Sequence, residues 1–310
     1  MSLTISAVVP TFRRERHLVD TLRSLIALLK PGDEILVVDQ TPQHEPETEA
    51  ALQGWARAGT IRWFRKSRPS QCEAMNVAAH LARGDLLLFL DDDIVPFESL
   101  LEAHRRAFLE EPGLTATSGQ VLQPWNPEPL PGASADRGLG FDFASSLPCD
   151  VLSLMAGNFA LRRETFLAIG GMDENFAGNN YRNDAEMAHR ILARTGRRVR
   201  FVPQAGMRHL LAGGGNRAFG HKDTWGAIGG SIGDYYFALK WLPLGAAARH
   251  SLRRMVRAPL NRFTLRRPWL VPMIVARELV ALGRAAARTR RPRYARPLQA
   301  YDDVAPGWVP

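Results

Sequence analysis

The order of hydrophobic and polar residues predicts alternating strands and helices over the first hundred residues. Apolar residues from Ile5 to Val9 are typical of a buried strand, and leucines and isoleucine then recur at helical spacing between positions 18 and 29. The further apolar runs and helix-like stretches fall at residues 35–38, 45–58, 61–64, 72–81 and 86–90. This alternation predicts an α/β fold in which a mixed, mostly parallel sheet is flanked by helices.

The pattern changes after Leu109. Residues 124–149 are rich in proline and glycine, which predicts a long loop. A strand and the start of a helix follow in "VLSLMAGNFALRRETF", and "NDAEMAHRILARTG" predicts a helix that has Asp184 in its first turn and ends at Gly196. We therefore expect one domain over residues 1–241 and a helical C-terminal extension over residues 242–310.

Three consecutive aspartates follow the most apolar of these strands, in "LLLFLDDDIVP". Aspartate is a poor strand former, so the cluster is expected in the loop after the strand. It could be a solvated acidic turn, or its carboxylates could hold a hard divalent cation such as Mg²⁺ or Mn²⁺. Ligands of parallel sheets bind outside the carboxyl ends of the strands, where this chain also places Pro10-Thr11 and Asp39-Gln40.

The distribution of charge bears on the class of partner. The net charge of the 310 residues is +9, but the segment from Lys240 onward holds 14 arginines and one lysine against three acidic residues. The part before Lys240 is therefore slightly acidic, which argues against a nucleic-acid-binding protein. Only Cys72 and Cys149 are present, at no metal or redox spacing, which suits a cytoplasmic protein. Neither a signal peptide nor a membrane-spanning segment is expected from the apolar runs.

The turn after the first strand narrows the kind of nucleotide site. It reads "PTFRRER", without the glycines of a dinucleotide site, and no P-loop pattern is present. Asp39 could accept hydrogen bonds from a base or ribose, and Arg13 or Arg68 could face phosphates. For each of these residues the alternative is an ordinary surface charge.

Five motifs in order resemble those of family-2 glycosyltransferases with the GT-A fold. They are "VVPTFRRERHLVDTLRSL", "EILVVDQTP", "GDLLLFLDDDIVP", "AGNFALRRETFLAIGGMDENF" and "NDAEMAHRI". The resemblance spans Ile5 to His209. It implies an inverting, metal-dependent enzyme that moves one sugar from a nucleotide-diphosphate sugar to an acceptor hydroxyl on a lipid-linked, saccharide or small-molecule acceptor. Polysaccharide, glycolipid or glycosylated-metabolite synthesis would be its setting.

The resemblance also implies roles at the donor site. The family's DxD motif matches Asp91 to Asp93, with Asp93 as the direct ligand of Mn²⁺ or Mg²⁺ and Asp91 on the sugar or ribose. A metal is needed because the leaving diphosphate gathers negative charge. His209 would be a second metal ligand or else a plain loop histidine. The remaining residues expected on the donor side are Pro10, Thr11, Arg13, Asp39, Gln40, Arg68, Asn76, Asp92 and Arg217.

The family's catalytic base lies in an acidic pair at a helix start, matched here by Asn183-Asp184. Asp184 would take the proton of the acceptor hydroxyl, with Glu186 as the fallback base, while Gly157 and Asn158 match the acceptor-side strand. Stabilisation of the helix N-terminus is the alternative role of Asp184. Because Asn183 replaces an acid, a noncatalytic GT-A-like binding module stays open as an alternative. A metal-dependent nucleotidyltransferase, which would attack at phosphorus, is the other.

Arginines at positions 277, 284 and 288 recur on one predicted helical face beside apolar residues. Such a basic amphipathic helix can lie on an anionic membrane surface, or it can pack on the catalytic domain. The first alternative implies a cytoplasmic protein that is peripheral on the inner face of a membrane.

Overall fold

The fold is built on one large mixed sheet, seen in a computed structural model that describes residues 3–132, 136–137, 140–176, 178, 180–215 and 225–308. Along the sheet the strands run in the order β12-β3-β2-β1-β4-β10-β6-β11-β5, and β9 pairs with β11. These strands are β1 (Ile5–Thr11), β2 (Glu34–Asp39), β3 (Arg62–Lys66), β4 (Leu86–Leu90), β5 (Ile94–Pro96), β6 (Ala116–Leu122), β9 (Cys149–Val151), β10 (Asn158–Arg162), β11 (Val199–His209) and β12 (Val304–Pro306). A separate short pair is formed by β7 (Asp136–Arg137) and β8 (Gly140–Phe141).

Strands β1 to β4 are parallel neighbours, and β10 inserts antiparallel between β4 and β6. All five residues of β4 are buried, as a strand covered on both faces requires. The predicted α/β class with a mixed, mostly parallel sheet is confirmed. The parallel arrangement also brings the carboxyl ends of β1, β2 and β4 to one edge of the sheet.

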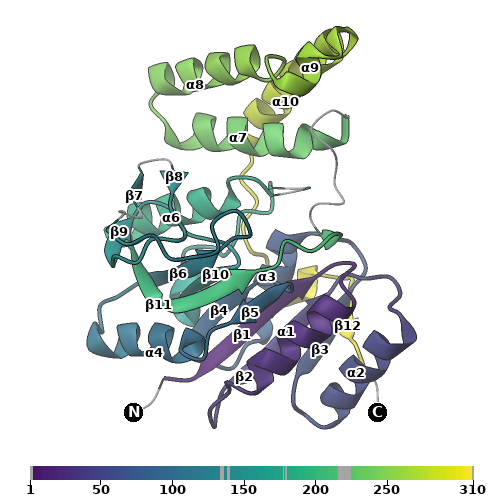
Figure 1. The fold of residues 1–310 in the computed structure, drawn as a ribbon, viewed down its shortest axis with the longest axis vertical. Coiled ribbons are helices and arrows are strands. Elements are labelled where there is room, and N and C mark those ends of the chain that lie inside the picture. The colour runs from purple at the N-terminus through teal and green to yellow at the C-terminus, as the bar shows by residue number, and fades with distance from the viewer. Residues whose placement is uncertain are drawn as a thin grey trace.

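Helices cover both faces of the sheet (Figure 1). One apolar core lies between the sheet and α1, α2 and α4, and the other lies between the sheet and α3, α5, α6, α7 and α10. The helices are α1 (Arg16–Ile26), α2 (Pro46–Arg57), α3 (Gln71–Leu81), α4 (Leu100–Glu110), α5 (Arg163–Ala168), α6 (Asn183–Thr195), α7 (Ile228–Trp241), α8 (Leu244–Arg257), α9 (Arg262–Leu265) and α10 (Val271–Thr289). Short 3-10 turns are η2 (Trp225–Ala227), η3 (Pro268–Leu270) and η4 (Leu298–Ala300). As predicted, α6 is followed by Gly196, in the left-handed conformation that glycine favours.

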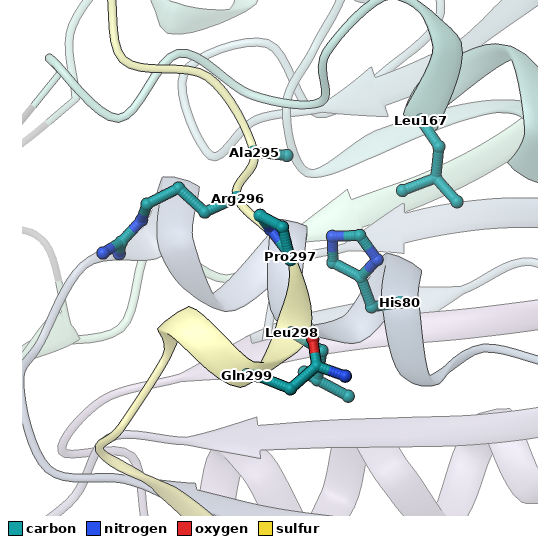
Figure 2. Close-up of a pocket in the computed structure, with 7 residues that line it drawn as sticks. All are labelled: His80, Leu167, Ala295, Arg296, Pro297, Leu298 and Gln299. Carbon is teal, nitrogen blue, oxygen red and sulfur yellow. The ribbon is translucent and has the colours of Figure 1, made fainter.

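The helices that follow Trp241 form the layer farthest from the sheet in Figure 1. The chain then runs back, and β12 pairs antiparallel with β3, Val304 opposite Lys66. Figure 2 shows residues 295–299 of this returning segment beside His80 and Leu167, around a cavity of about 470 Å³. The helical part of the expected extension is thus followed by a segment that belongs to the sheet.

Of the three arginines of α10, only Arg284 is exposed, so the outward basic face that their spacing predicts does not form as a whole. Arg277 is buried and donates to Glu278, and Arg288 donates to the carbonyl oxygen of Asn175 at 2.6 Å. The exposed residues of α10 include Leu279 and Val280 as well as Arg284. Within the described part of the chain, every helix is too short or too polar to span a bilayer.

Candidate active site

Side chains from four strand ends meet in one pocket of about 150 Å³. The strands β1, β2, β4 and β11 supply its walls, because their ends lie at the same edge of the sheet. Its described lining consists of Pro10, Thr11, Phe12, Arg14, Gln40, Gln71, Asp91, Asp92, Asp93, His209 and Gly215. The larger cavity of Figure 2 has no carboxylate among its described lining residues, whereas the smaller pocket has three, which suits a cation.

Asp91, Asp93 and His209 converge as a candidate metal centre. Each offers one ligand atom, and the three atoms lie within 4.8 Å of one another. The Nε2 atom of His209 is 3.2 Å from Asp93 Oδ1 and 3.7 Å from Asp91 Oδ2. Pairing of β11 with β5 sets this geometry, because His209 lies opposite Ile94, the residue after Asp93. Two carboxylates and one imidazole fit Mn²⁺ well and Mg²⁺ through the carboxylates.

Arg14 lines the pocket, although the sequence analysis did not name it. Its buried guanidinium lies 3.2 Å from Asp92 Oδ1 and 3.3 Å from Asp93 Oδ2, and it also donates to the carbonyl oxygens of Ala212 and Gly213. The predicted Arg13 is exposed, with its guanidinium over the ring of Phe12. The motif "FRRER" indicates that an arginine follows β1 near the pocket. Which of its arginines is buried depends on the backbone turn, where Arg13 has a φ of 53°.

The two buried aspartates differ in their electrostatics. Burial raises the pKa of Asp92 to about 7, although Arg14 and the hydroxyl of Thr11, which donates to Asp92 at 2.7 Å, work against that shift. Burial acts in the same direction on Asp93. Its hydrogen bond with His209, the charge of Arg14 and the Ala212 N–H nevertheless hold the pKa of Asp93 below its usual value. Asp93 is therefore the carboxylate best kept ionised for a cation.

Gly157 is required by the position of Asp91. The peptide N–H of Asp91 donates to the Gly157 carbonyl at 3.2 Å, and a Cβ added at Gly157 would lie 2.1 Å from Asp91 Oδ2. Asn158, the other residue predicted on the acceptor side, is fully buried. Its amide donates to the carbonyl oxygens of Gln120 and Ala205. In this structure Asn158 ties strands together and does not face the pocket.

Asp39 and Gln40 follow β2 but differ in their surroundings. The Asp39 carboxylate is buried and lies 2.8 Å from His44 Nε2, while it accepts from the Trp63 indole and from the Thr41 N–H. Through these contacts the Asp39 carboxylate stabilises the loop after β2. Asp39 is not among the described residues that line the pocket. Gln40 does line the pocket, with its side chain between Thr11 and Ser70.

Two further residues predicted on the donor side are engaged elsewhere. Arg68 forms ion pairs with Asp302 and Asp303 of the returning segment. Asn76 is buried and forms two hydrogen bonds with the backbone of Met172. Neither side chain is among the described residues that line the pocket. Arg217, predicted to meet phosphate, lies outside the described residues.

Asp184 lies in the first turn of α6, as predicted, and Oδ1 accepts from the Ala185 N–H at 2.7 Å. Burial raises the pKa of Asp184, which makes its carboxylate a stronger base than an exposed aspartate. The segment before α6 reaches the wall of the pocket, because the Asn180 amide donates to Gln71, one of the lining residues, at 3.1 Å, while Asp184 itself is not among the described lining residues. Gln71, Phe12 and Gly215 are further lining residues that the sequence analysis did not name.

Glu186, the predicted fallback base, has a different role in the structure. It is fully buried, pairs with Arg190 at 2.9 Å, and lies 2.8 Å from Lys240 Nζ. Both partners come from the helical core behind the site. These two ion pairs engage the Glu186 carboxylate within the core, and Glu186 is not among the described residues that line the pocket.

Known proteins give an independent view of this chain. The model of the family described as Glycosyl transferase family 2 matches residues 6–170. The glucosyl-dolichyl phosphate glucuronosyltransferase of Haloferax volcanii is 24% identical over 226 residues, which are 67% of this chain and 70% of that protein.

Solved structures share the fold at low sequence identity. The mannosyltransferase PcManGT of Pyrobaculum calidifontis, in complex with GDP-Man and Mn²⁺, is 17% identical, has a TM-score of 0.53, and is covered over 88% of its chain by 94% of this one. GalNAc-T7, with UDP, GalNAc and Mn²⁺, is also 17% identical, with a TM-score of 0.55 over 76% of this chain. The present chain matches only half the length of GalNAc-T7. The fold is therefore GT-A, and the match to the family model shows that the chain belongs to glycosyltransferase family 2.

Proposed function

We propose that this protein is an inverting, metal-dependent glycosyltransferase that moves one sugar from a nucleotide-diphosphate sugar to an acceptor hydroxyl. Glycosyl transfer follows from the family. The convergence of Asp91, Asp93 and His209 at the edge of the sheet is the observation that supports metal dependence. The two solved relatives described above hold Mn²⁺ together with a nucleotide or a nucleotide sugar, which supports the same assignment.

The donor is held by the residues around the metal centre. A bound divalent cation supplies positive charge that offsets the charge gathering on the leaving diphosphate. Asp93 and His209 are proposed to hold that cation, with Asp91 on the donor side of the centre. Arg14 keeps Asp92 and Asp93 in place and adds a fixed positive charge within the same pocket. Thr11 and Gln40 border the space into which the nucleotide would bind.

Asp184 is proposed as the general base. Its carboxylate takes the proton of the acceptor hydroxyl while the hydroxyl oxygen bonds to the anomeric carbon and the bond from that carbon to the diphosphate breaks. Attack from the face opposite the leaving group inverts the configuration. The raised pKa of Asp184 suits this role, because a more basic carboxylate accepts the proton more readily.

The proposed acceptor is a hydroxyl of a lipid-linked saccharide. The name of the Haloferax volcanii relative contains such a compound, glucosyl-dolichyl phosphate. An acceptor of this kind would place the protein at a membrane, and we propose a peripheral position on its cytoplasmic face.

Calorimetric titration with UDP, GDP and dTDP, with Mn²⁺ and after chelation, tests the donor part. We expect one nucleoside diphosphate to bind only with metal, and Asp93→Ala to lose that binding. Equal affinity of the wild type and Asp93→Ala in Mn²⁺ would contradict the metal assignment. Absence of binding in folded protein would favour the noncatalytic module, and release of pyrophosphate from a nucleoside triphosphate would favour the nucleotidyltransferase.

Asp184→Asn tests the base separately, because it keeps the size of the side chain and removes its basicity. Donor binding should stay within about two-fold of the wild type, while transfer falls by roughly 10²- to 10⁴-fold, the usual contribution of a general base. Unchanged turnover in Asp184→Asn would remove Asp184 from the mechanism.

A further inference from the structure

Large apolar side chains are exposed mainly on the helices that follow Trp241. Among the described residues, six large apolar side chains are at least 60% exposed, and five of these lie within this segment. We call them the outer apolar residues: Leu244, Leu252, Leu260, Leu265 and Trp269. They belong to α8, α9, η3 and the turn between α8 and α9, in the layer farthest from the sheet in Figure 1. Their concentration in one segment suggests this segment as a site of interaction.

The turns of α8 show how this surface is organised. Ala247 and Ser251 are buried on the side of α8 that faces the protein. Leu252 and Val256, four residues apart, share the outward side and are more than half exposed. Their positions keep them out of the core, so folding of this chain leaves them uncovered.

The exposed charges around the outer apolar residues are positive. Residues 241–290 contain eleven arginines and one acidic residue, Glu278. Glu278 is fully buried and is paired with Arg254 and Arg277, so it contributes no negative charge to the surface. Exposed arginines lie between the outer apolar residues along the chain: Arg249, Arg253, Arg257, Arg262 and Arg266.

This combination of groups selects one kind of partner. A second copy of the chain would bring the same positive charges face to face, which opposes association. A nucleic acid would match the arginines but would leave the leucines without an apolar partner. An anionic bilayer matches both, because arginines meet lipid phosphates while leucine side chains and the Trp269 indole enter the interfacial region.

The outer helices are also tied to the segment that carries the proposed base. On α8, Arg254 Nη1 lies 2.9 Å from Asp234 Oδ2, and the other oxygen of Asp234 lies 3.0 Å from Nε of Arg182. Arg182 immediately precedes α6 and is two residues before Asp184. A membrane bound to α8 would therefore lie at a fixed position relative to the start of α6.

We propose that α8, α9 and η3 form a docking surface for an anionic bilayer, with the outer apolar residues inserted at the interface and the arginines between them on the lipid phosphates. The helices lie along the membrane and do not cross it. This inference rests on the proposed function, because a lipid-linked acceptor would lie in the membrane to which the surface binds. Vesicle binding can nevertheless be measured without sugar transfer.

The test is co-sedimentation of the full chain with two kinds of vesicle. One is made of phosphatidylcholine alone, and the other contains about 30% phosphatidylglycerol, which gives its surface a negative potential. We expect binding to the anionic vesicles that weakens with salt, and a blue shift of tryptophan emission. The double variant Leu252→Glu/Trp269→Glu should bind at least 10-fold more weakly. The matched control is Leu109→Glu on α4, because Leu109 is similarly apolar and 45% exposed, and it should bind like the wild type.

Several results would overturn the proposal. These are no binding of the folded protein to anionic vesicles, equal binding to both vesicle types, and undiminished binding of the double variant. A dimer that Leu252→Glu dissociates would assign the surface to a second copy, and tighter binding to an oligonucleotide than to vesicles would assign it to nucleic acid. Failure of donor binding with vesicle binding intact would refute the proposed function and leave the docking surface standing.

Discussion

Gly157→Ala would test the geometry of the candidate metal centre with a single methyl group. The added Cβ would lie 2.1 Å from Oδ2, 2.2 Å from Cγ and 2.7 Å from Oδ1 of Asp91. The backbone of Gly157 is outside the left-handed region, so alanine causes no conformational strain there. The effect of the substitution must therefore arise from its contact with Asp91.

The size of the effect follows from the overlap. Ordinary carbon contacts begin at about 3.5 Å, so the carboxylate has to retreat by roughly 1.4 Å. The Asp91 side chain is 22% exposed, which gives it room to turn toward solvent without unfolding the strand. Misplacing a group around a metal centre typically costs about 10- to 100-fold in affinity, or roughly 1.4–2.7 kcal/mol.

The assay is calorimetric titration of the nucleoside diphosphate that the wild type binds, with Mn²⁺ present. We expect 10- to 100-fold weaker binding in Gly157→Ala and a midpoint of urea unfolding close to that of the wild type. Gly54→Ala is the matched control, because a Cβ at Gly54 meets nothing within 4 Å. Gly54 lies within α2, so this control should gain about 1 kcal/mol of stability and bind normally. Wild-type affinity in folded Gly157→Ala would refute the placement of Asp91 in the centre.

Three further predictions concern the base, its neighbour on α6 and the returning segment. Burial raises the pKa of Asp184 and the charge of Arg182 lowers it, so Arg182→Met should raise that pKa further. The active form is the carboxylate, so the acid limb of kcat/KM against pH should move to higher pH, and a limb that stays in place would contradict this. Glu186→Gln leaves buried Arg190 without its carboxylate partner, while Lys240 keeps Asp173, and should destabilise the fold by about 3–5 kcal/mol in urea unfolding, whereas lost transfer at wild-type stability would restore Glu186 as a base. Removal of residues 293–310 uncovers β3 and takes Asp303 from buried Lys66, so the thermal midpoint should fall, and an unchanged midpoint would mean that the returning segment adds no stability to the sheet.

The parts of the fold that sequence predicted well are those encoded locally. Apolar runs and helical spacing mark β1 to β4 and α1 to α3, because burial on both faces of a parallel sheet demands continuous apolar strands. The aspartates after β4 were correctly placed at a strand end for the same reason. The family resemblance named His209 as a possible ligand, but its place beside the aspartates depends on the register of β11 against β5, which periodicity could not predict.

The sequence could not identify partners that lie far apart along the chain. Arg68 and Asp302 form an ion pair across 234 positions, and Glu186 and Lys240 lie 54 positions apart. From the sequence alone, each of these charged residues could equally be a surface residue or a catalytic one. Arg277 fails for a different reason, because helical spacing put it on a basic face, while in the structure it is buried and paired with its neighbour Glu278.

The pairing of β12 with β3 bears on how this protein folds during synthesis. Lys66 and Asp303 are in contact but lie 237 positions apart in sequence. A ribosome that adds roughly 5–20 residues each second needs more than ten seconds to make the intervening chain. During that interval β3 is an uncovered edge strand, which is prone to pair with strands of other chains. Slow translation at low temperature, or a chaperone that shields this edge, should therefore change the yield of folded protein more than the stability of the finished molecule.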